Sequence, residues 1–348
     1  MSKTDSASGK PSIFVTCRWP QAAEVALSRH FDVTLNEGDK PLSRDALIAG
    51  FASHDIAAPT VSDRIDAEII AAGAAGSCRL IANYGVGVNH IDLATAAAHD
   101  IPVSNTPGVL TDATADIAMT LMLMLCRRAG EGERELRAGE WTGWRPTHLV
   151  GRALSGKTLG IIGMGRIGRA VAHRAHFGFG MDVVFQNRSA VADGGGVGAR
   201  QLADVAAVCA ASDFVSLHCA ATPETTNIMN ADAIAAMRPG GYLINTARGD
   251  VVDETALAKA LHDGRIGGAG LDVFQGEPQV NQALLSAPNT VLLPHLGSAT
   301  EETRVAMGMK VVENACAFAA GTVLPTRWAD DAAFRLACCC PLCLCCRA

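Results

Sequence analysis

Three segments far apart in the chain carry an arginine, a glutamate and a histidine that could act together. Arg248 lies in INTARGDVVDE, Glu277 in LDVFQGEP and His295 in LLPHLGS, each just after an apolar run typical of a strand. The carboxyl ends of parallel strands meet at one edge of a sheet, where open α/β sheets bind their ligands. We therefore expect these three side chains to converge at such an edge.

This combination of side chains suits the reduction of a 2-keto acid. A guanidinium can hold the carboxylate and polarise the neighbouring carbonyl with a fixed charge. A protonated histidine can supply the proton as hydride arrives, and a carboxylate beside it orients the imidazole and favours the charged form. Each residue alone has a plainer interpretation, a solvated charge for Arg248 or Glu277 and a capping or packing role for His295. Their shared place relative to the sheet favours the catalytic hypothesis.

A glycine-rich turn predicts a dinucleotide-binding site. Gly163, Gly165 and Gly168 follow the apolar run TLGIIG, and a helical pattern opens at Arg166 and Ile167. The first glycine permits the tight turn, the second lets the backbone approach a pyrophosphate, and the third lets the helix pack closely on the sheet. The helix N-terminus supplies N–H groups and a positive dipole end. The alternative is a tight strand-to-helix turn that binds no ligand.

The residues about 20 positions beyond this turn predict which nucleotide it holds. NAD-binding sites usually carry an acid there, but this chain has Asn187, Arg188 and Ser189. The nearby Asp182 begins the second strand, at the end away from the glycine turn. A guanidinium with amide and hydroxyl neighbours would bind the 2′-phosphate that a carboxylate would repel. The sequence therefore predicts NADP(H), with NAD(H) and a solvated Arg188 as the weaker alternative.

The order of apolar runs and helical patterns predicts an α/β fold in two parts. The 348 residues suggest two domains, and strands alternate with Ala-rich helices from Ser12 to Asp92 and again from Lys157 onward. Residues 109–128 predict a long helix, and the charged stretch 129–150 predicts an exposed arm. We also expect a helix over residues 199–211. A capping box at Ser298 and Glu301 predicts the start of the last helix.

Composition excludes several classes of protein. The net charge of −6 argues against nucleic-acid binding. The first residues lack the apolar core of a signal peptide, and the longest apolar run, 117–126, is too short to span a bilayer, so we expect a soluble cytoplasmic protein. Six scattered cysteines predict reduced, buried thiols. The six between Cys338 and Cys346 lack a histidine and separated pairs, so we predict no metal site and a disordered tail over 337–348.

Six motifs together resemble the D-2-hydroxyacid dehydrogenase family. They are NYGVGVNHIDL, NTPGVLTDATAD, GKTLGIIGMGRIGRAVA, INTARGDVVDE, GLDVFQGEP and LLPHLGSAT, and the likeness runs from about Ile13 to Pro325. Within the family the chain is most similar to the NADPH-dependent glyoxylate/hydroxypyruvate reductases, whose second strand ends in residues like Asn187–Ser189. The one departure noted in these motifs is Asn89, where many members carry aspartate, which implies altered hydrogen bonding rather than altered chemistry.

The resemblance implies a particular architecture. Two doubly wound parallel-sheet domains are expected: a flavodoxin-like substrate domain, 1–108 with 298–336, and a Rossmann domain that binds NADP, 109–297, inserted into it. The family closes these domains over its ligands and forms homodimers through the cofactor domain. The arm would then reach the partner subunit, and Trp141 or Trp144 would approach its active site. The alternative is that both tryptophans pack within the arm.

The resemblance also assigns roles to residues. Arg248, Glu277 and His295 match the family's catalytic residues, and Arg248 also binds substrate. Val86 and Gly87 match the positions whose N–H groups bind the substrate carboxylate. The cofactor contacts that it implies beyond the glycine turn and Asn187–Ser189 are Thr111, His218, Cys219, Pro223, Thr246, Ala247, Asp272 and Gly297. Asp272 would contact the nicotinamide carboxamide, with Gly297 beside it.

The implied activity is reduction of a small 2-keto acid, glyoxylate or hydroxypyruvate, to the D-2-hydroxy acid with NADPH. One alternative is a broader 2-keto acid reductase of the D-lactate type. Another is a nucleotide-sensing interaction protein, because the family includes corepressors that keep the catalytic residues. The sequence does not rank glyoxylate against hydroxypyruvate.

Overall fold

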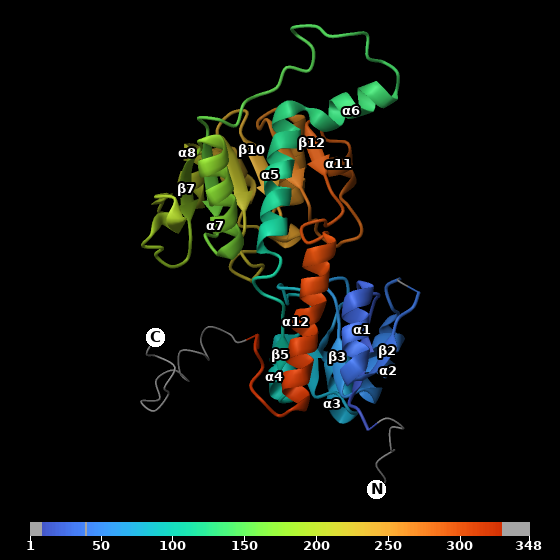
Figure 1. Ribbon diagram of the computed structural model, residues 1–348. Coiled ribbons are helices and arrows are strands. Elements are labelled where there is room, and N and C mark those ends of the chain that lie inside the picture. The colour runs from blue at the N-terminus through green and yellow to red at the C-terminus, as the bar shows by residue number, and fades with distance from the viewer. Residues whose placement is uncertain (1–8, 39, 329–348) are drawn as a thin grey trace. The chain divides into compact units, whose positions relative to one another are not determined.

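The structure, a computed structural model, describes residues 9–38 and 40–328. They form two compact units, which divide between Pro107 and Gly108 and again between Thr303 and Arg304. The sequence places these divisions at 108/109 and 297/298, and the roles that it gives to the two domains stay predictions. The predicted disordered tail, 337–348, lies outside the described residues. Figure 1 shows the elements of both units.

The unit that contains both ends of the described chain is built on a five-stranded parallel sheet in the order β2-β1-β3-β4-β5, the flavodoxin-like order. Buried residues of the α2, α3 and α4 segments pack on one face, and α1 meets α12 where Gly308 contacts Ala23. The strands are β1 Ser12–Val15, β2 Asp32–Leu35, β3 Ile56–Ala58, β4 Leu80–Ala82 and β5 Val103–Ser104, and the helices are α1 Gln21–His30, α2 Arg44–Ser53, α3 Ala67–Ala75, α4 Leu93–Ala98 and α12 Glu301–Ala319.

The other unit is built on a seven-stranded parallel sheet in the order β12-β11-β10-β9-β6-β7-β8. The chain adds strands outward from β6 through β7 to β8, returns to the other side of β6 at β9, and then continues to β12. Strand order therefore reverses between β6 and β9, the place where such sheets bind nucleotides. The strands are β6 Thr158–Ile162, β7 Asp182–Gln186, β8 Arg200–Gln201, β9 Phe214–Leu217, β10 Tyr242–Asn245, β11 Gly268–Leu271 and β12 Thr290–Leu292.

Helices cover both faces of this second sheet. Buried residues of α5 and α7 pack on one face, and those of α8, α9 and α10 on the other. Because both faces are covered, the central strands read as continuous apolar runs. Aspartate or asparagine caps several helices by accepting a backbone N–H. The helices are α5 Thr111–Arg127, α6 Ala129–Arg137, α7 Arg166–His173, α8 Val205–Ala211, α9 Ala231–Ala236, α10 Glu254–His262 and α11 Gln282–Leu285.

The predicted class of two parallel-sheet α/β domains is confirmed, and two local predictions are wrong. Residues 200–201 form the edge strand β8, and the helix starts later because Asp204 caps it through the Ala207 N–H. The last helix begins at Glu301, where Thr300 Oγ1 accepts the Thr303 N–H, so Ser298 is not its cap. Within residues 9–38 and 40–328, no helix is long and apolar enough to cross a membrane.

Candidate active site

Three neighbouring strands bring Arg248, Glu277 and His295 to one edge of the seven-stranded sheet. The residues follow β10, β11 and β12, which are adjacent in the sheet. His295 Nδ1 lies 2.8 Å from Glu277 Oε2, and Glu277 Oε1 accepts the Phe274 N–H at 2.8 Å. Both side chains keep about a third of their surface exposed, 30% for His295 and 34% for Glu277. The imidazole is thus oriented by the carboxylate and still reachable from outside the protein.

Charges at this edge act on one another. Burial alone would raise the pKa of Glu277, but the hydrogen bond and charge of His295, the Phe274 N–H and the Arg248 charge together leave that pKa below its usual range. Burial lowers the pKa of the Arg248 guanidinium, and the Glu277 and Asp250 carboxylates oppose that shift. Arg248 Nη1 donates to the Ala247 carbonyl at 2.6 Å. An ionised glutamate therefore stands close to both the guanidinium and the imidazole.

Asp272 holds the segment that carries the histidine. This carboxylate is 1% exposed and accepts the N–H groups of Leu296 at 2.6 Å and Gly297 at 2.7 Å. The Asp272 carbonyl also accepts the His295 N–H, and His295 has a φ of 55°, in the left-handed region that costs energy for a side chain of this size. Burial raises the pKa of Asp272. Asp272 thus fixes the unusual backbone at His295, an anchoring role that the sequence does not reveal.

The glycine turn has the geometry that the sequence predicts, and its three glycines are required for different reasons. Gly163 has a φ of 96°, and a Cβ there would lie 2.7 Å from the Cys219 nitrogen. A Cβ at Gly168 would lie 2.2 Å from the Gly163 oxygen, so only glycine lets α7 pack this closely. At Gly165 a Cβ would meet no protein atom within 4 Å. Packing within the protein therefore does not require glycine at this position. A phosphate that approaches the α7 N-terminus at Arg166 and Ile167 would require it, because a side chain there would stand in the way.

The end of β7 lies beside this turn. Asn187 Oδ1 accepts the Met164 N–H at 3.2 Å, and its amide nitrogen donates to the Ser189 carbonyl at 3.1 Å. Gln201, on β8, donates to the carbonyls of Asn187 and Ser189. Arg188 and Ser189 are exposed. The three residues are therefore held by neighbours in the turn and the edge strand, and Gln201 is a contributor that the sequence analysis missed.

The residues predicted near the adenosine half lie beyond β9. A hydrogen bond joins His218 Nε2 and Ser216 Oγ at 2.8 Å, and Thr246 Oγ1 lies 3.5 Å from His218 Nδ1. Burial lowers the pKa of His218 to about 3, so this imidazole is neutral near pH 7. Cys219 contacts the glycine turn at Gly163. Of the remaining predicted residues, Pro223 lies in the turn after β9 and Thr111 begins α5.

The amide turn predicted to bind a carboxylate lies in the other unit, just after β4. Asn83 shapes this turn by donating to the carbonyls of Gly85 and Gly87, both at 3.0 Å, and His90 Nε2 lies 3.0 Å from Asn83 Oδ1. Asn105 donates to the Val86 carbonyl at 2.9 Å. Within the described part of the chain, the N–H groups of Val86 and Gly87 donate to no protein acceptor. They can therefore serve a carboxylate.

The arm predicted over residues 129–150 contains the helix α6 and then an irregular stretch. His148 Nε2 lies 2.8 Å from Glu135 Oε2 and ties the stretch back to the helix. Trp141 is 51% exposed and Trp144 is 82% exposed. The interpretation in which both tryptophans pack within the arm is therefore wrong for Trp144, which presents an apolar surface instead.

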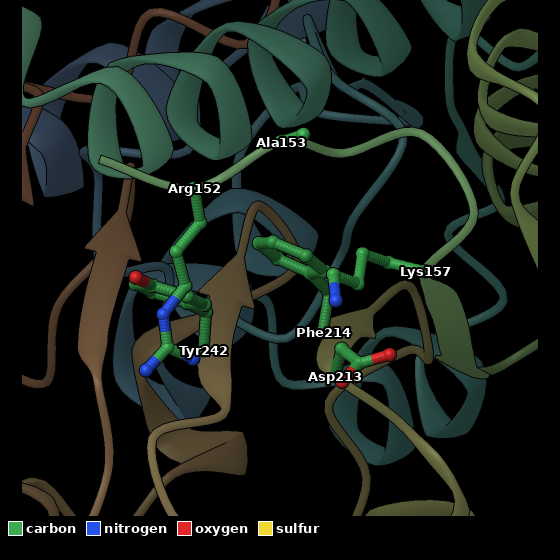
Figure 2. A pocket seen from close by; sticks show the side chains of 6 residues that line it. All are labelled: Arg152, Ala153, Lys157, Asp213, Phe214 and Tyr242. Atoms are coloured by element: carbon green, nitrogen blue, oxygen red, sulfur yellow. The ribbon is translucent and has the colours of Figure 1, made fainter. Parts of the chain in front are cut away.

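A small hollow lies at the opposite edge of the seven-stranded sheet, at the amino ends of β6, β9 and β10. Figure 2 shows its lining, in which the rings of Phe214 and Tyr242 stack with centroids 5.0 Å apart and Arg152 lies over Tyr242. Its volume of about 30 Å³ suffices for a water molecule or two. It is distant in the fold from the strand ends that carry the candidate site.

Comparisons with known proteins identify the family. The profile described as D-isomer specific 2-hydroxyacid dehydrogenase, NAD binding domain, matches residues 119–297. The glyoxylate reductase of Thermococcus litoralis is 41% identical over 320 residues, 91% of this chain and 96% of its own. This chain belongs to the D-isomer specific 2-hydroxyacid dehydrogenase family. It carries that family's NAD(P)-binding domain, as the sequence predicts.

Solved structures of similar proteins show the same fold. A D-isomer specific 2-hydroxyacid dehydrogenase from Polaromonas has a TM-score of 0.85 at 37% identity and covers 92% of this chain and 100% of its own. An NADPH-dependent glyoxylate/hydroxypyruvate reductase from Sinorhizobium meliloti, solved with NADP and malonate, has a TM-score of 0.81 at 34% identity. The match covers 92% of this chain and 97% of the reductase.

Proposed function

We propose that this protein reduces a small 2-keto acid, glyoxylate or hydroxypyruvate, to the D-2-hydroxy acid with NADPH. The observation that carries the proposal is the 2.8 Å contact between His295 Nδ1 and Glu277 Oε2, at the strand edge that also presents Arg248. The family supports 2-keto acid reduction as the class of reaction, and relatives named glyoxylate reductase support the substrate.

The residues divide the chemistry among them. Bound NADPH supplies the hydride. Arg248 binds the substrate carboxylate and polarises the carbonyl that is reduced, and the N–H groups of Val86 and Gly87 also bind the carboxylate. Because His295 Nδ1 faces Glu277, its Nε2 is the atom that delivers the proton to the carbonyl oxygen. The ionised Glu277 stabilises the imidazolium before transfer and holds the ring in place.

The preference for NADPH rests on the end of β7. Arg188 supplies a positive charge there, with Ser189 beside it, and Asp182 begins the strand opposite Thr158, at the end far from the glycine turn. A carboxylate at the near end would repel a 2′-phosphate, whereas a guanidinium binds it. The reductase from Sinorhizobium meliloti, solved with NADP, supports this choice.

The decisive experiment is a kinetic comparison of glyoxylate and hydroxypyruvate with NADPH and NADH, followed at the nicotinamide absorbance. We expect turnover with NADPH that His295→Gln reduces by roughly 10²-fold or more without loss of NADPH binding. His262→Gln, a matched change on α10 outside the site, should leave turnover intact. Equal efficiency with pyruvate would indicate the broader D-lactate-type reductase. NADPH binding without turnover of any small 2-keto acid would indicate a nucleotide-sensing protein.

We further propose a homodimer joined through the cofactor domain and its arm, because Trp141 and Trp144 leave apolar surface exposed there. Sedimentation of the intact chain tests this assembly. The absence of nucleic-acid partners and the location in the cytoplasm stay predictions from composition.

A further inference from the structure

Glu254 is a buried carboxylate that the proposed chemistry does not use. It is the first residue of α10 and is 4% exposed, which is rare for a glutamate without a specific partner. It does not cap the helix, because Asp253 accepts the Ala256 N–H at 2.9 Å in that role. Its Oε1 accepts the backbone N–H of Gln275 at 2.7 Å. The partner of this buried acid is thus the loop that carries Glu277.

Two carboxylates accept successive backbone N–H groups of that loop. The Phe274 N–H donates to Glu277 Oε1, and the next N–H, of Gln275, donates to Glu254 Oε1. The Gln275 side chain also donates from Nε2 to the Val252 carbonyl at 2.9 Å. Main chain and side chain of Gln275 therefore both bind the segment 252–254.

That segment is continuous with the one that bears Arg248. A Cβ on Gly249 would lie 1.9 Å from the Phe274 carbonyl carbon and 2.2 Å from the Gln275 nitrogen, so the two backbones touch. In the segment 249–254, Gly249 therefore packs against the peptide between Phe274 and Gln275, and residues 252–254 accept hydrogen bonds from Gln275. We call this set of contacts the Glu254 brace.

We propose that Glu254 is a positioning residue, which locks the Arg248 segment to the Glu277 loop so that the guanidinium and the Glu277–His295 pair keep the spacing that reduction needs. The inference rests on the proposed function for its kinetic readout. Burial and the charges of Asp250 and Glu277 all raise the pKa of Glu254, so an ionised carboxylate at this position is unfavourable in free energy. Without it, the Gln275 N–H would lose its acceptor, and the loop would shift to find another.

The test compares three variants of the full chain. Glu254→Met fills similar space without an acceptor, and Glu254→Ala replaces it if that protein does not fold. Glu254→Gln keeps an oxygen for the Gln275 N–H. Asp253→Ala, the matched control, removes the neighbouring cap from the same helix. We expect Glu254→Met to lower kcat on the order of 10- to 100-fold with an unchanged Kd for NADPH, Glu254→Gln to stay within about 3-fold, and Asp253→Ala to lower Tm but not kcat.

Two results would overturn the brace: a kcat for Glu254→Met equal to that of Asp253→Ala, or a Glu254→Gln loss as large as that of Glu254→Met. A readout without turnover separates this inference from the proposed function. The ring nitrogen resonances of His295, assigned with His295→Gln, should shift in Glu254→Met and stay in Asp253→Ala. If the unmodified protein reduces no 2-keto acid, the proposed function fails and these spectra alone decide the brace, with unshifted resonances counting against it.

Discussion

Substituting Gly249 by alanine tests whether the catalytic groups depend on a backbone contact. The added Cβ would lie 1.9 Å from the Phe274 carbonyl carbon, and ordinary contact begins near 3.4 Å. The two segments must therefore separate by about 1.5 Å. Because φ at Gly249 is outside the left-handed region, the perturbation is this clash and not backbone strain.

A separation of this size moves Arg248 away from the Glu277 loop. Misplacing a reacting group by about 1 Å costs roughly 10²-fold in rate, which corresponds to about 2.7 kcal/mol of lost transition-state stabilisation. We expect Gly249→Ala to lower kcat/KM for the keto acid by that order. The Kd for NADPH should change little, because the glycine turn follows β6 and Gly249 follows β10.

The assay is steady-state NADPH oxidation at saturating cofactor, with fluorescence titration for the Kd. Gly178→Ala is the matched control, because a Cβ there meets no protein atom within 4 Å. A folded Gly249→Ala protein that keeps kcat/KM within about 3-fold of Gly178→Ala would refute the reasoning, since it would show that the spacing tolerates the shift.

Three further predictions concern the cofactor and stability. Arg188→Asp should lower the ratio of kcat/KM with NADPH to that with NADH by roughly 10- to 100-fold, as loss of a charged hydrogen bond predicts; an unchanged ratio would contradict the assignment of Arg188. Gly165→Ala should weaken NADPH binding at unchanged Tm, whereas Gly168→Ala should lower Tm, because only the second Cβ meets protein, at 2.2 Å from the Gly163 oxygen; thermal melts without cofactor and titrations distinguish them. Burial lowers the pKa of His218 to about 3 in the folded protein, so below pH 6.5 only the unfolded chain takes up a proton at this residue. The free energy of unfolding should therefore decrease as the pH is lowered, by up to about 2 kcal/mol at pH 5. Denaturant titrations at several pH values should show a weaker pH dependence for His218→Gln.

The architecture and the placement of the principal candidate residues at strand ends were predictable, because each depends on a pattern along the chain. Apolar runs followed by polar residues place Arg248, Glu277 and His295 at strand ends, and parallel strands then bring those ends to one edge. The glycine spacing likewise predicts the turn after β6. Prediction failed where a helical pattern and a helix cap competed for the same residues. Residues 200–201 fit the helical pattern, but Asp204 caps the helix after them, so they pair with β7 instead.

The supporting contacts were not predictable, because their partners are backbone groups. The N–H of Gln275 that Glu254 binds, and those of Leu296 and Gly297 that Asp272 binds, exist in every residue type except proline. No spacing rule links positions 21, 24 or 25 residues apart. The close approach of Gly249 to Phe274 is hidden for the same reason, since a glycine after an arginine reads as an ordinary turn.

The acids at this edge therefore divide by what they bind. Glu277 faces an imidazole, so its negative charge enters the proposed chemistry directly. Asp272 and Glu254 face backbone N–H groups, so what they contribute is oxygen atoms at fixed points, and burial raises the pKa of both. Asp272 fastens the segment of His295, and Glu254 fastens the loop of Glu277. The 2.8 Å contact between His295 Nδ1 and Glu277 Oε2 thus depends on two acids, one holding each partner's segment, and neither acid needs to touch a substrate.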